Sequence, residues 1–510
     1  MNQDQFIDEY HYVHRQDKEL GKGGQGVVFR TKDPDLAIKL VTDEAGNPLT
    51  QNEHIRKYSE RFERVKLLPI PQDINISTPV ALLKEHAGYV MPLLNEMVPF
   101  SDFWLDGKVA KEIKREDIPS WLLPKGNSDE EISQENEDKL KPLKEIVHYH
   151  NTGGLRRRLH VLYKCASLLA RLHGTGLVYG DISPNNIFIS NDSSHSSVWL
   201  IDADNIRFEI SSNSGIVYTP KYGAPELVQE KDGARPISDC HAFAVVAFYL
   251  LALIHPFIGQ KVDGSDEDDW ADEENDGEGA EDRAYAGIFP WVDDEEDDSN
   301  ASMSGLPRVL LLTPKLQQLF QQTLGAGRGQ PWLRPSIYHW PEALAQATDL
   351  TVQCPNCSMS YYHNYKDAEI EVFQCPYCNT PRPAMIKIES YPWQGDQGIP
   401  KEPIWSYTHE VHDNSLITLP NRVLTEFSMV DSDKAELTIK IAKDHILLKK
   451  VDNSSLNISI AVNDSNSGDF KDLYSQSKLI IKPAKELNFW LFINTKVPRL
   501  VSLKIERGIK

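Results

Sequence analysis

Two short polar motifs, each beside an apolar run, constrain this chain more than any other feature. In VYGDISPNNIFI (residues 178–189), Asn186 follows Asp181 by five residues, and in WLIDADN (199–205) Asp202 follows a strand-like run. Asn and Asp side chains carry the hard oxygen ligands that Mg²⁺ prefers. Each motif alone could be a turn with a capping side chain. Together they predict a metal site built from a loop and a strand end.

Two upstream features add a phosphate-binding element. Gly21, Gly23 and Gly26 stand in G-x-G-x-x-G spacing within GKGGQGVVF (21–29). Glycines let backbone N–H groups approach phosphate oxygens without a side-chain clash. The turn leads into the strand-like runs VVFR and LAIKL and not into a helix, which favours a phosphate-covering hairpin over a dinucleotide-binding turn. Lys39 lies in the second run, so four motifs follow one another in an order that chance turns would not give.

In this order the motifs resemble those of the protein kinase superfamily, and residues 14–346 resemble the eukaryotic-like serine/threonine protein kinases of bacteria. TPKYGAPEL (219–227) resembles the end of an activation segment, with Ala224, Pro225 and Glu226 as its A-P-E. Asp239, in SDCHAFAVVAFYLL, resembles the anchoring acid of the central helix of the C-lobe. Arg334 resembles the late arginine of these kinases, which implies a buried Glu226–Arg334 ion pair.

The resemblance implies ATP- and Mg²⁺-dependent phosphoryl transfer. Asp181 would orient the acceptor hydroxyl and accept its proton, while Asn186 and Asp202 would bind Mg²⁺. Met91 would be the gatekeeper beside an adenine hinge at residues 92–94. The implied ATP-binding residues are Gly21, Gly23, Gly24, Gly26, Val28, Ala37, Lys39, Met91, Leu93 and Leu94.

A charged helical pattern from about residue 51 to 68 is expected to carry the glutamate that pairs with Lys39. The candidates are Glu60 and Glu63, with Glu53 just upstream. Spacing to the following strand favours Glu60, but the packing periodicity does not choose between them.

The catalytic loop departs from the kinase pattern at Tyr179, Gly180 and Ser183, which replace His, Arg and Lys. Gly180 removes the cation that usually pairs with a phosphorylated activation segment, so we expect activity without that phosphorylation. Ser183 removes a positive charge near the γ-phosphate. Lys221 or a second Mg²⁺ are candidate replacements. D-F-G becomes D-A-D, with Ala203 in place of the phenylalanine.

Lys39, Asp181, Asn186 and Asp202 are all retained, so the sequence predicts an active serine/threonine protein kinase in bacterial signalling. Its substrate would be a protein, with the chain itself as one candidate. The main alternative is an ATP-binding pseudokinase scaffold. A small-molecule kinase is a weaker alternative, because aminoglycoside phosphotransferases share the Gly-Asp pair of the loop but lack an A-P-E segment.

Two C-x-x-C pairs, Cys354/Cys357 and Cys375/Cys378, are separated by 17 residues. This spacing predicts a Cys₄ zinc ribbon, and the metal would be structural because four thiolates leave no open position. After about residue 386 the apolar residues alternate with period two, which predicts a β-sandwich or small barrel. The order of kinase, ribbon and β-domain resembles bacterial kinases encoded beside a PP2C-type phosphatase and a von Willebrand A-type protein, which are candidate partners.

The predicted fold class is therefore α+β: a bilobal kinase fold followed by a Cys₄ zinc ribbon and an all-β sandwich-like domain. The predicted boundaries are 14–94 for the N-lobe, 95–348 for the C-lobe, 349–385 for the ribbon and 386–510 for the β-domain. Within the C-lobe we expect a charged, largely surface insert with few apolar anchors at 101–150 and an acidic, disordered insert at 262–299.

Composition limits the partners and the compartment. Residues 261–300 hold 18 acidic residues against Lys261 and Arg283, a net −16 of the total −21. No basic tract offers a nucleic-acid surface. The longest apolar run, residues 242–254, is too short to span a bilayer, and no secretory signal is visible. The cysteine pattern suits a reducing compartment, so we expect a cytoplasmic protein.

Overall fold

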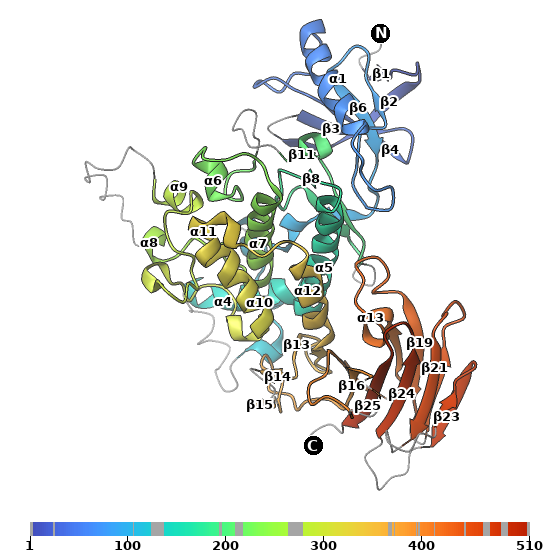
Figure 1. Cartoon of the computed structure of the whole chain (residues 1–510). Coiled ribbons are helices and arrows are strands. Elements are labelled where there is room, and N and C mark those ends of the chain that lie inside the picture. The colour runs from blue at the N-terminus through green and yellow to red at the C-terminus, as the bar shows by residue number, and fades with distance from the viewer. Residues whose placement is uncertain are drawn as a thin grey trace.

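The computed structural model describes residues 4–23, 26–105, 107–123, 137–192, 196–209, 218–263, 279–365, 370–371, 373–393, 395, 398–412, 414–442, 445–462, 470–480 and 488–506. Within these ranges the fold class predicted from the sequence is confirmed (Figure 1). No helix in the described ranges is long and apolar enough to cross a membrane.

The N-lobe is a six-stranded antiparallel sheet with one helix on it. Its strands, in spatial order, are β1 (Gln5–Ile7), β2 (Val13–Gly23), β3 (Gly26–Thr31), β4 (Leu36–Leu40), β6 (Gly88–Pro92) and β5 (Ala81–Leu82). The helix α1 (Asn52–Lys66) buries Phe62 and Val65, and the ring of Phe62 meets Tyr89 of β6 edge-on at 4.7 Å. The sheet begins at Gln5 and not at residue 14, because Phe6 of β1 is buried in the sheet's own core.

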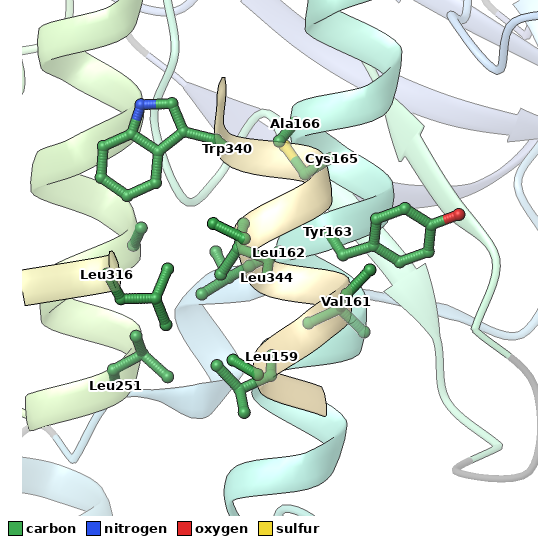
Figure 2. Close-up of a cluster of buried hydrophobic side chains, with 14 of the residues drawn as sticks. Leu159, Val161, Leu162, Tyr163, Cys165, Ala166, Leu251, Leu316, Trp340 and Leu344 are labelled. Atoms are coloured by element: carbon green, nitrogen blue, oxygen red, sulfur yellow. The ribbon is translucent and has the colours of Figure 1, made fainter. Parts of the chain in front are cut away.

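The C-lobe is built around the helices α5 (Gly154–His173), α7 (Pro236–Ala252) and α12 (His339–Asp349). Figure 2 shows Leu162 of α5, Leu344 of α12 and Leu316 of α10 (Pro314–Phe320) pointing toward one another, and all three are buried. From Ala242 onward the helix α7 is apolar on every side, as expected for a helix at the centre of a lobe. The other α-helices in the described part of the lobe are α2 (Gly107–Glu112), α4 (Glu137–Asn151), α6 (Pro225–Val228), α8 (Gln260–Asp263), α9 (Ala280–Tyr285) and α11 (Gly327–Gly329).

Two small sheets hold the loops between the lobes. One has the strand order β10 (Val198–Leu200), β9 (Ile187–Ser190) and β7 (Met97–Pro99). The other pairs β8 (Leu177–Val178) with β11 (Arg207–Phe208). The loop between β8 and β9 and the loop between β10 and β11 therefore lie beside each other, and these loops contain the two motifs noted first in the sequence.

The predicted surface insert at 101–150 is partly wrong. Phe103, Trp104 and Ile118 are buried, and Tyr149 of α4 stacks on the buried guanidinium of Arg158 at 3.8 Å. Residues 124–136 lie outside the described ranges. Because these aromatic anchors are few among many charges, the composition of the segment concealed that it belongs to the core of the lobe.

The predicted disorder of residues 262–299 is wrong for the part that the structure describes. Residues 264–278 lie outside the described ranges, but residues 279–299 form α9 and a loop. Ala284, Trp291 and Val292 are buried in the core of the C-lobe. The rings of Trp291 and of Phe248 in α7 pack in a T-shaped pair with their centroids 5.4 Å apart. Most acidic side chains of the described part of this stretch are exposed and lie beside a small apolar anchor.

A ribbon and a two-sheet domain follow α12. The ribbon pairs β12 (Thr351–Gln353) with β13 (Ser360–Tyr362) and β14 (Asn364–Tyr365) with β15 (Ile370–Glu371). One sheet of the β-domain has the order β17 (Trp405–Glu410), β16 (Met385–Pro392), β25 (Arg499–Glu506), β24 (Asn488–Asn494), β21 (Asn457–Val462) and β22 (Lys471–Asp472). The other has the order β18 (Leu416–Pro420), β19 (Ala435–Ile441), β20 (His445–Lys450) and β23 (Gln476–Ile480). Buried side chains of both sheets share one core, as in a sandwich.

The β-domain is fastened to the C-lobe and lies away from the N-lobe (Figure 1). Arg156 of α5 binds Glu410 of β17 with an Nη2–Oε2 distance of 2.9 Å. Asp349, at the end of α12, accepts hydrogen bonds from the indole of Trp405 (2.9 Å) and from Arg422 (2.7 Å) in the helix α13 (Asn421–Leu424). Asp349, Glu410 and Arg422 are buried, so these contacts fix the β-domain on the lobe.

Candidate active site

The loop after β8 is anchored to α7 through its backbone. The N–H groups of Tyr179 and Gly180 donate to the carboxylate of Asp239 at 2.8 and 2.9 Å, and His173 Nε2 lies 2.9 Å from the same carboxylate. Gly180 has a φ of 83°, which glycine adopts at little cost. The Asp239 anchor therefore imposes a backbone conformation that explains glycine at this position.

Tyr179 joins the two motif loops. Its side chain is fully buried, and its hydroxyl donates to the carbonyl of Ile201, directly before Asp202. Burial, followed by the charges of Asp202 and Asp181, raises the pKa of Tyr179 well above its usual value. The phenol therefore stays neutral and serves as a hydrogen-bond donor.

Asp181 lies at the centre of a hydrogen-bonded group. The amide nitrogen of Asn186 donates to its backbone oxygen at 2.9 Å and to Oδ2 at 3.2 Å, and the hydroxyl of Thr219 donates to Oδ1 at 2.6 Å. Burial raises the pKa of Asp181, and the bond from Thr219 partly offsets this. Because the nitrogen of Asn186 is used on Asp181, its amide oxygen is left to bind a cation.

Lys39 of β4 lies between two carboxylates of the second motif. Its ammonium donates to Asp202 Oδ1 and, at 2.8 Å, to Asp204 Oδ2. Burial lowers the pKa of Lys39, but the charges of the two aspartates outweigh it and the net pKa is raised. Asp202 adopts the left-handed backbone conformation (φ 58°, ψ 51°), a strain that is common at functional sites. Its side chain, 24% exposed, is the more accessible of the two carboxylates.

The predicted glutamate partner of Lys39 is wrong. The side chain of Glu60 is 68% exposed and pairs with Arg56, and Glu63 is exposed as well. The residue of α1 that reaches the site is Arg61, whose Nε donates to the backbone oxygen of Asp204 (3.2 Å) and whose Nη2 donates to the side chain of Asn205 (2.7 Å). Sequence reasoning missed Arg61, Asp204 and Asn205, although an aspartate in place of the D-F-G glycine was a visible signal.

One face of the N-lobe sheet carries the predicted adenine-binding side chains. In the strand register Val28 lies opposite Lys39, and Ala37 lies opposite Met91, so these four side chains share a face. Leu93 and Leu94 follow β6 and are partly buried.

The glycines of the hairpin have different surroundings. A Cβ on Gly26 would lie 2.2 Å from the Leu40 carbonyl oxygen, so close strand packing requires glycine there. A Cβ on Gly21 would meet no atom within 4 Å, and Gly23 pairs with Gly26 across the turn. Gly24 lies outside the described residues.

Residues 133–286, which include both motif loops and the A-P-E segment, match the model of the protein kinase domain family. Over these residues the chain is similar to protein kinase domains.

Among curated proteins, the chain is similar to the serine/threonine-protein kinase PknL of Mycobacterium tuberculosis, with 37% identity over 95 residues, which cover 18% of this chain and 23% of the relative. It is also similar to serine/threonine-protein kinase pkn2 of Myxococcus xanthus (31% over 111 residues; 20% and 13%) and to PknD of Chlamydia pneumoniae (22% over 259 residues; 48% and 24%). The chain spans about a quarter or less of the length of these relatives.

The structure brings together the remaining pair predicted for the kinase domain. Arg334 binds Glu226 with two parallel bonds of 2.6 and 2.8 Å, and both residues are buried. Lys221 is exposed, and its ammonium lies over the ring of Tyr285 at 5.5 Å. Whether Lys221 replaces the lysine that is missing at Ser183 therefore stays a prediction.

In the ribbon, which follows α12 in the sequence, the four cysteines converge. All four sulfur atoms lie within 4.8 Å of one another, with Cys354–Cys378 at 3.5 Å and Cys357–Cys375 at 3.6 Å. A tetrahedral zinc–thiolate site, with Zn–S bonds of about 2.3 Å, places its sulfurs about 3.8 Å apart. The cluster thus has the ligands and the spacing to hold a metal ion.

Proposed function

We propose that this chain is an ATP- and Mg²⁺-dependent serine/threonine protein kinase that acts in bacterial signalling. The observation that carries the proposal is the convergence of four groups from three elements. Lys39 contacts Asp202, and Asn186 contacts Asp181, within a domain that matches the protein kinase family. Phosphoryl transfer requires this kind of site, because its catalysis is chiefly positioning and charge stabilisation.

The chain's own residues divide the work. Asn186 and Asp202 would hold Mg²⁺, which neutralises phosphate charge when bound. Two observations support this fit. The amide nitrogen of Asn186 donates to Asp181, which leaves the amide oxygen for the metal, and the side chain of Asp202 is partly exposed. Lys39 and the Gly-rich hairpin hold the phosphates. The adenine packs on the sheet face that carries Val28, Ala37 and Met91, next to Leu93 and Leu94.

Asp181 orients the acceptor hydroxyl and takes its proton. The bond from Thr219 supports this role, because Oδ1 already accepts a hydroxyl hydrogen bond at 2.6 Å. A serine or threonine side chain of a protein substrate, including one of this chain, offers the same group. The Asp239 anchor on the loop backbone supports activity without activation-segment phosphorylation, since it holds the loop without an arginine.

The ribbon holds a structural zinc ion, and the protein acts in the cytoplasm. The PP2C-type phosphatase and the von Willebrand A-type protein implied by the domain order remain its proposed partners. The ribbon supports a structural role for the metal because four thiolates complete a tetrahedral site.

The strongest alternative is an ATP-binding scaffold without transfer activity. It is favoured by Ser183, which removes one cation near the γ-phosphate, and by the exposed position of Lys221. A small-molecule kinase is less favoured, because the Glu226–Arg334 pair belongs to the A-P-E segment of protein kinases.

The test is transfer of labelled γ-phosphate from Mg-ATP by the purified full chain, to itself and to a generic basic protein. We expect label on serine or threonine in the native chain and none in Asp202→Ala. Asp452→Ala, which removes an exposed aspartate of the β-domain, is the matched control and should transfer normally. ATP binding without any transfer would replace the proposal with the scaffold. Label on small hydroxylated or amino compounds, but not on protein, would replace it with the small-molecule kinase.

A further inference from the structure

Lys39 and α1 are both attached to the short turn Ala203–Asn205, and not to each other. We propose that Asp204 is the residue that positions Lys39, and that Arg61 fastens α1 to the same turn. The proposal rests on the kinase function proposed above and names two further positioning residues for it.

Asp204 is suited to hold Lys39 permanently. Both side chains are buried, their Nζ–Oδ2 distance is 2.8 Å, and the ammonium lies 5.8 Å from the centre of the Tyr89 ring. Asp202 also contacts Lys39 but is the more exposed carboxylate. Asp202 is therefore free to turn toward Mg²⁺, while Asp204 keeps the lysine in place.

The residue of α1 that reaches the site is the cation Arg61, where a glutamate was expected. A helix glutamate would bind Lys39 directly, whereas the guanidinium of Arg61 binds the backbone of Asp204 and the side chain of Asn205. Asn205 in turn lies 3.4 Å from the carboxylate of Asp181. One turn thus links α1 to the lysine on one side and to the proposed catalytic base on the other.

A rotation of α1 cannot easily bring a glutamate to Lys39. Successive residues of a helix are about 100° apart, so Glu60 and Glu63 share the side of α1 opposite the one that carries Arg61, Phe62 and Val65. Turning either glutamate inward would carry Phe62 and Val65, each 1% exposed, out of the two core clusters in which they are buried. The apolar face of α1 therefore fixes the register that presents Arg61.

The first test compares phosphate transfer by full-length variants. Asp204→Asn should lower kcat/KM for Mg-ATP by roughly 10- to 100-fold, because the charge that holds Lys39 is lost. Asp204→Glu keeps the negative charge and should therefore recover part of the lost kcat/KM. A residue that served only for packing would not be rescued by the longer glutamate. Glu60→Gln and Glu63→Gln are the matched controls and should stay within about twofold of the native chain. A large loss in either control together with an active Asp204→Asn would overturn the proposal.

Two further measurements test the positioning roles of Asp204 and Arg61 and do not require phosphate transfer. Native Lys39 should be protected from an amine-reactive ester relative to the exposed Lys22 of the same chain. Asp204→Asn should remove that protection, and the two glutamine controls should keep it. In hydrogen exchange, Arg61→Ala should speed exchange in both α1 and residues 203–206, while Arg56→Ala, on the exposed face of α1, should not.

These outcomes separate the two proposals. If the native chain transfers no phosphate but Lys39 and the turn respond as expected, the kinase function fails and the positioning roles stand. If transfer occurs and Asp204→Asn leaves both transfer and Lys39 protection unchanged, the positioning role of Asp204 fails. If exchange after Arg61→Ala changes only in α1, the link through Arg61 fails.

Discussion

At the scale of single residues, the structure explains the unusual residues of the two motif loops. Tyr179 donates to the carbonyl before Asp202 and so joins the two motif loops. Gly180 adopts a positive φ that lets its N–H reach Asp239. Asp204, where a glycine was expected, binds the buried Lys39. Each departure therefore keeps a contact in the site and does not simply delete one.

Gly180→Arg should not restore an ordinary kinase loop. A side chain at a φ of 83° is strained, and its Cβ would lie 3.4 Å from the backbone oxygen of Asn205. We expect Gly180→Ala to lower the free energy of unfolding by about 1–2 kcal/mol, measured in urea, and Gly180→Arg by at least as much. The control is Gly107→Ala, where a Cβ meets no atom within 4 Å. A Gly180→Arg variant as stable as the native chain would show that the backbone does not require glycine.

At the scale of elements, the fold of the ribbon depends on metal binding by its four thiolates. The ribbon strands are two or three residues long, which is too short for a core of their own. Arg156 of α5 binds the ribbon at Thr351, and the N–H of Arg156 donates to Ser360 at 2.9 Å. The N–H of Gln353 in the ribbon donates to Glu410 of the β-domain at 3.0 Å, so the ribbon contacts both the C-lobe and the β-domain.

The purified chain should contain one zinc ion, measured by elemental analysis. Cys375→Ser should lose it and lower the free energy of unfolding of the ribbon by more than about 3 kcal/mol, because metal binding supplies the folding energy of such modules. Cys240→Ser is the matched control, since Cys240 is buried in α7 far from the cluster in sequence, and it should retain the metal. Equal metal content in the native chain and Cys375→Ser would contradict a Cys₄ site.

At the scale of the whole molecule, charged contacts hold the β-domain on the C-lobe. Glu410 is buried, and burial alone would raise its pKa. The hydrogen bonds and charge of Arg156 outweigh burial and lower the pKa of Glu410 to about 2, from 4.5. Because the folded-state pKa is the lower one, the pair stabilises the fold above about pH 4.5, and this contribution is lost as the pH falls toward 2.

The native chain should therefore lose on the order of 3 kcal/mol from this pair between pH 5 and pH 2, measured as the free energy of unfolding in urea. Glu410→Gln should be less stable than the native chain at pH 7, and the difference should narrow as the pH falls. Glu402→Gln removes an exposed glutamate of the same domain and should leave the pH dependence of the free energy of unfolding unchanged. A constant difference between the native chain and Glu410→Gln at all pH values would show that the pair contributes nothing.

The sequence by itself determined the features that depend on local spacing and residue chemistry. The two C-x-x-C pairs place four thiolates near one point, and the strand-like run before Asp202 presents that aspartate at its end. The period-two alternation after residue 386 was enough to predict an all-β domain, because successive side chains of a strand point to opposite faces of its sheet. The kinase fold followed from the order of the motifs, and the family match supports it.

Only the tertiary structure decided which residues hold Lys39 and where the charged segments lie. The rotation of α1 is set by the burial of Val65 and of Phe62, whose ring packs on Tyr89 of the sheet, and that rotation turns Arg61 inward and the glutamates outward. Likewise Trp291 is buried within a stretch whose composition is dominated by acids. In both cases a few apolar side chains, packed against partners distant in sequence, outweigh many exposed charges, because burial of apolar surface contributes more than charges that stay in water.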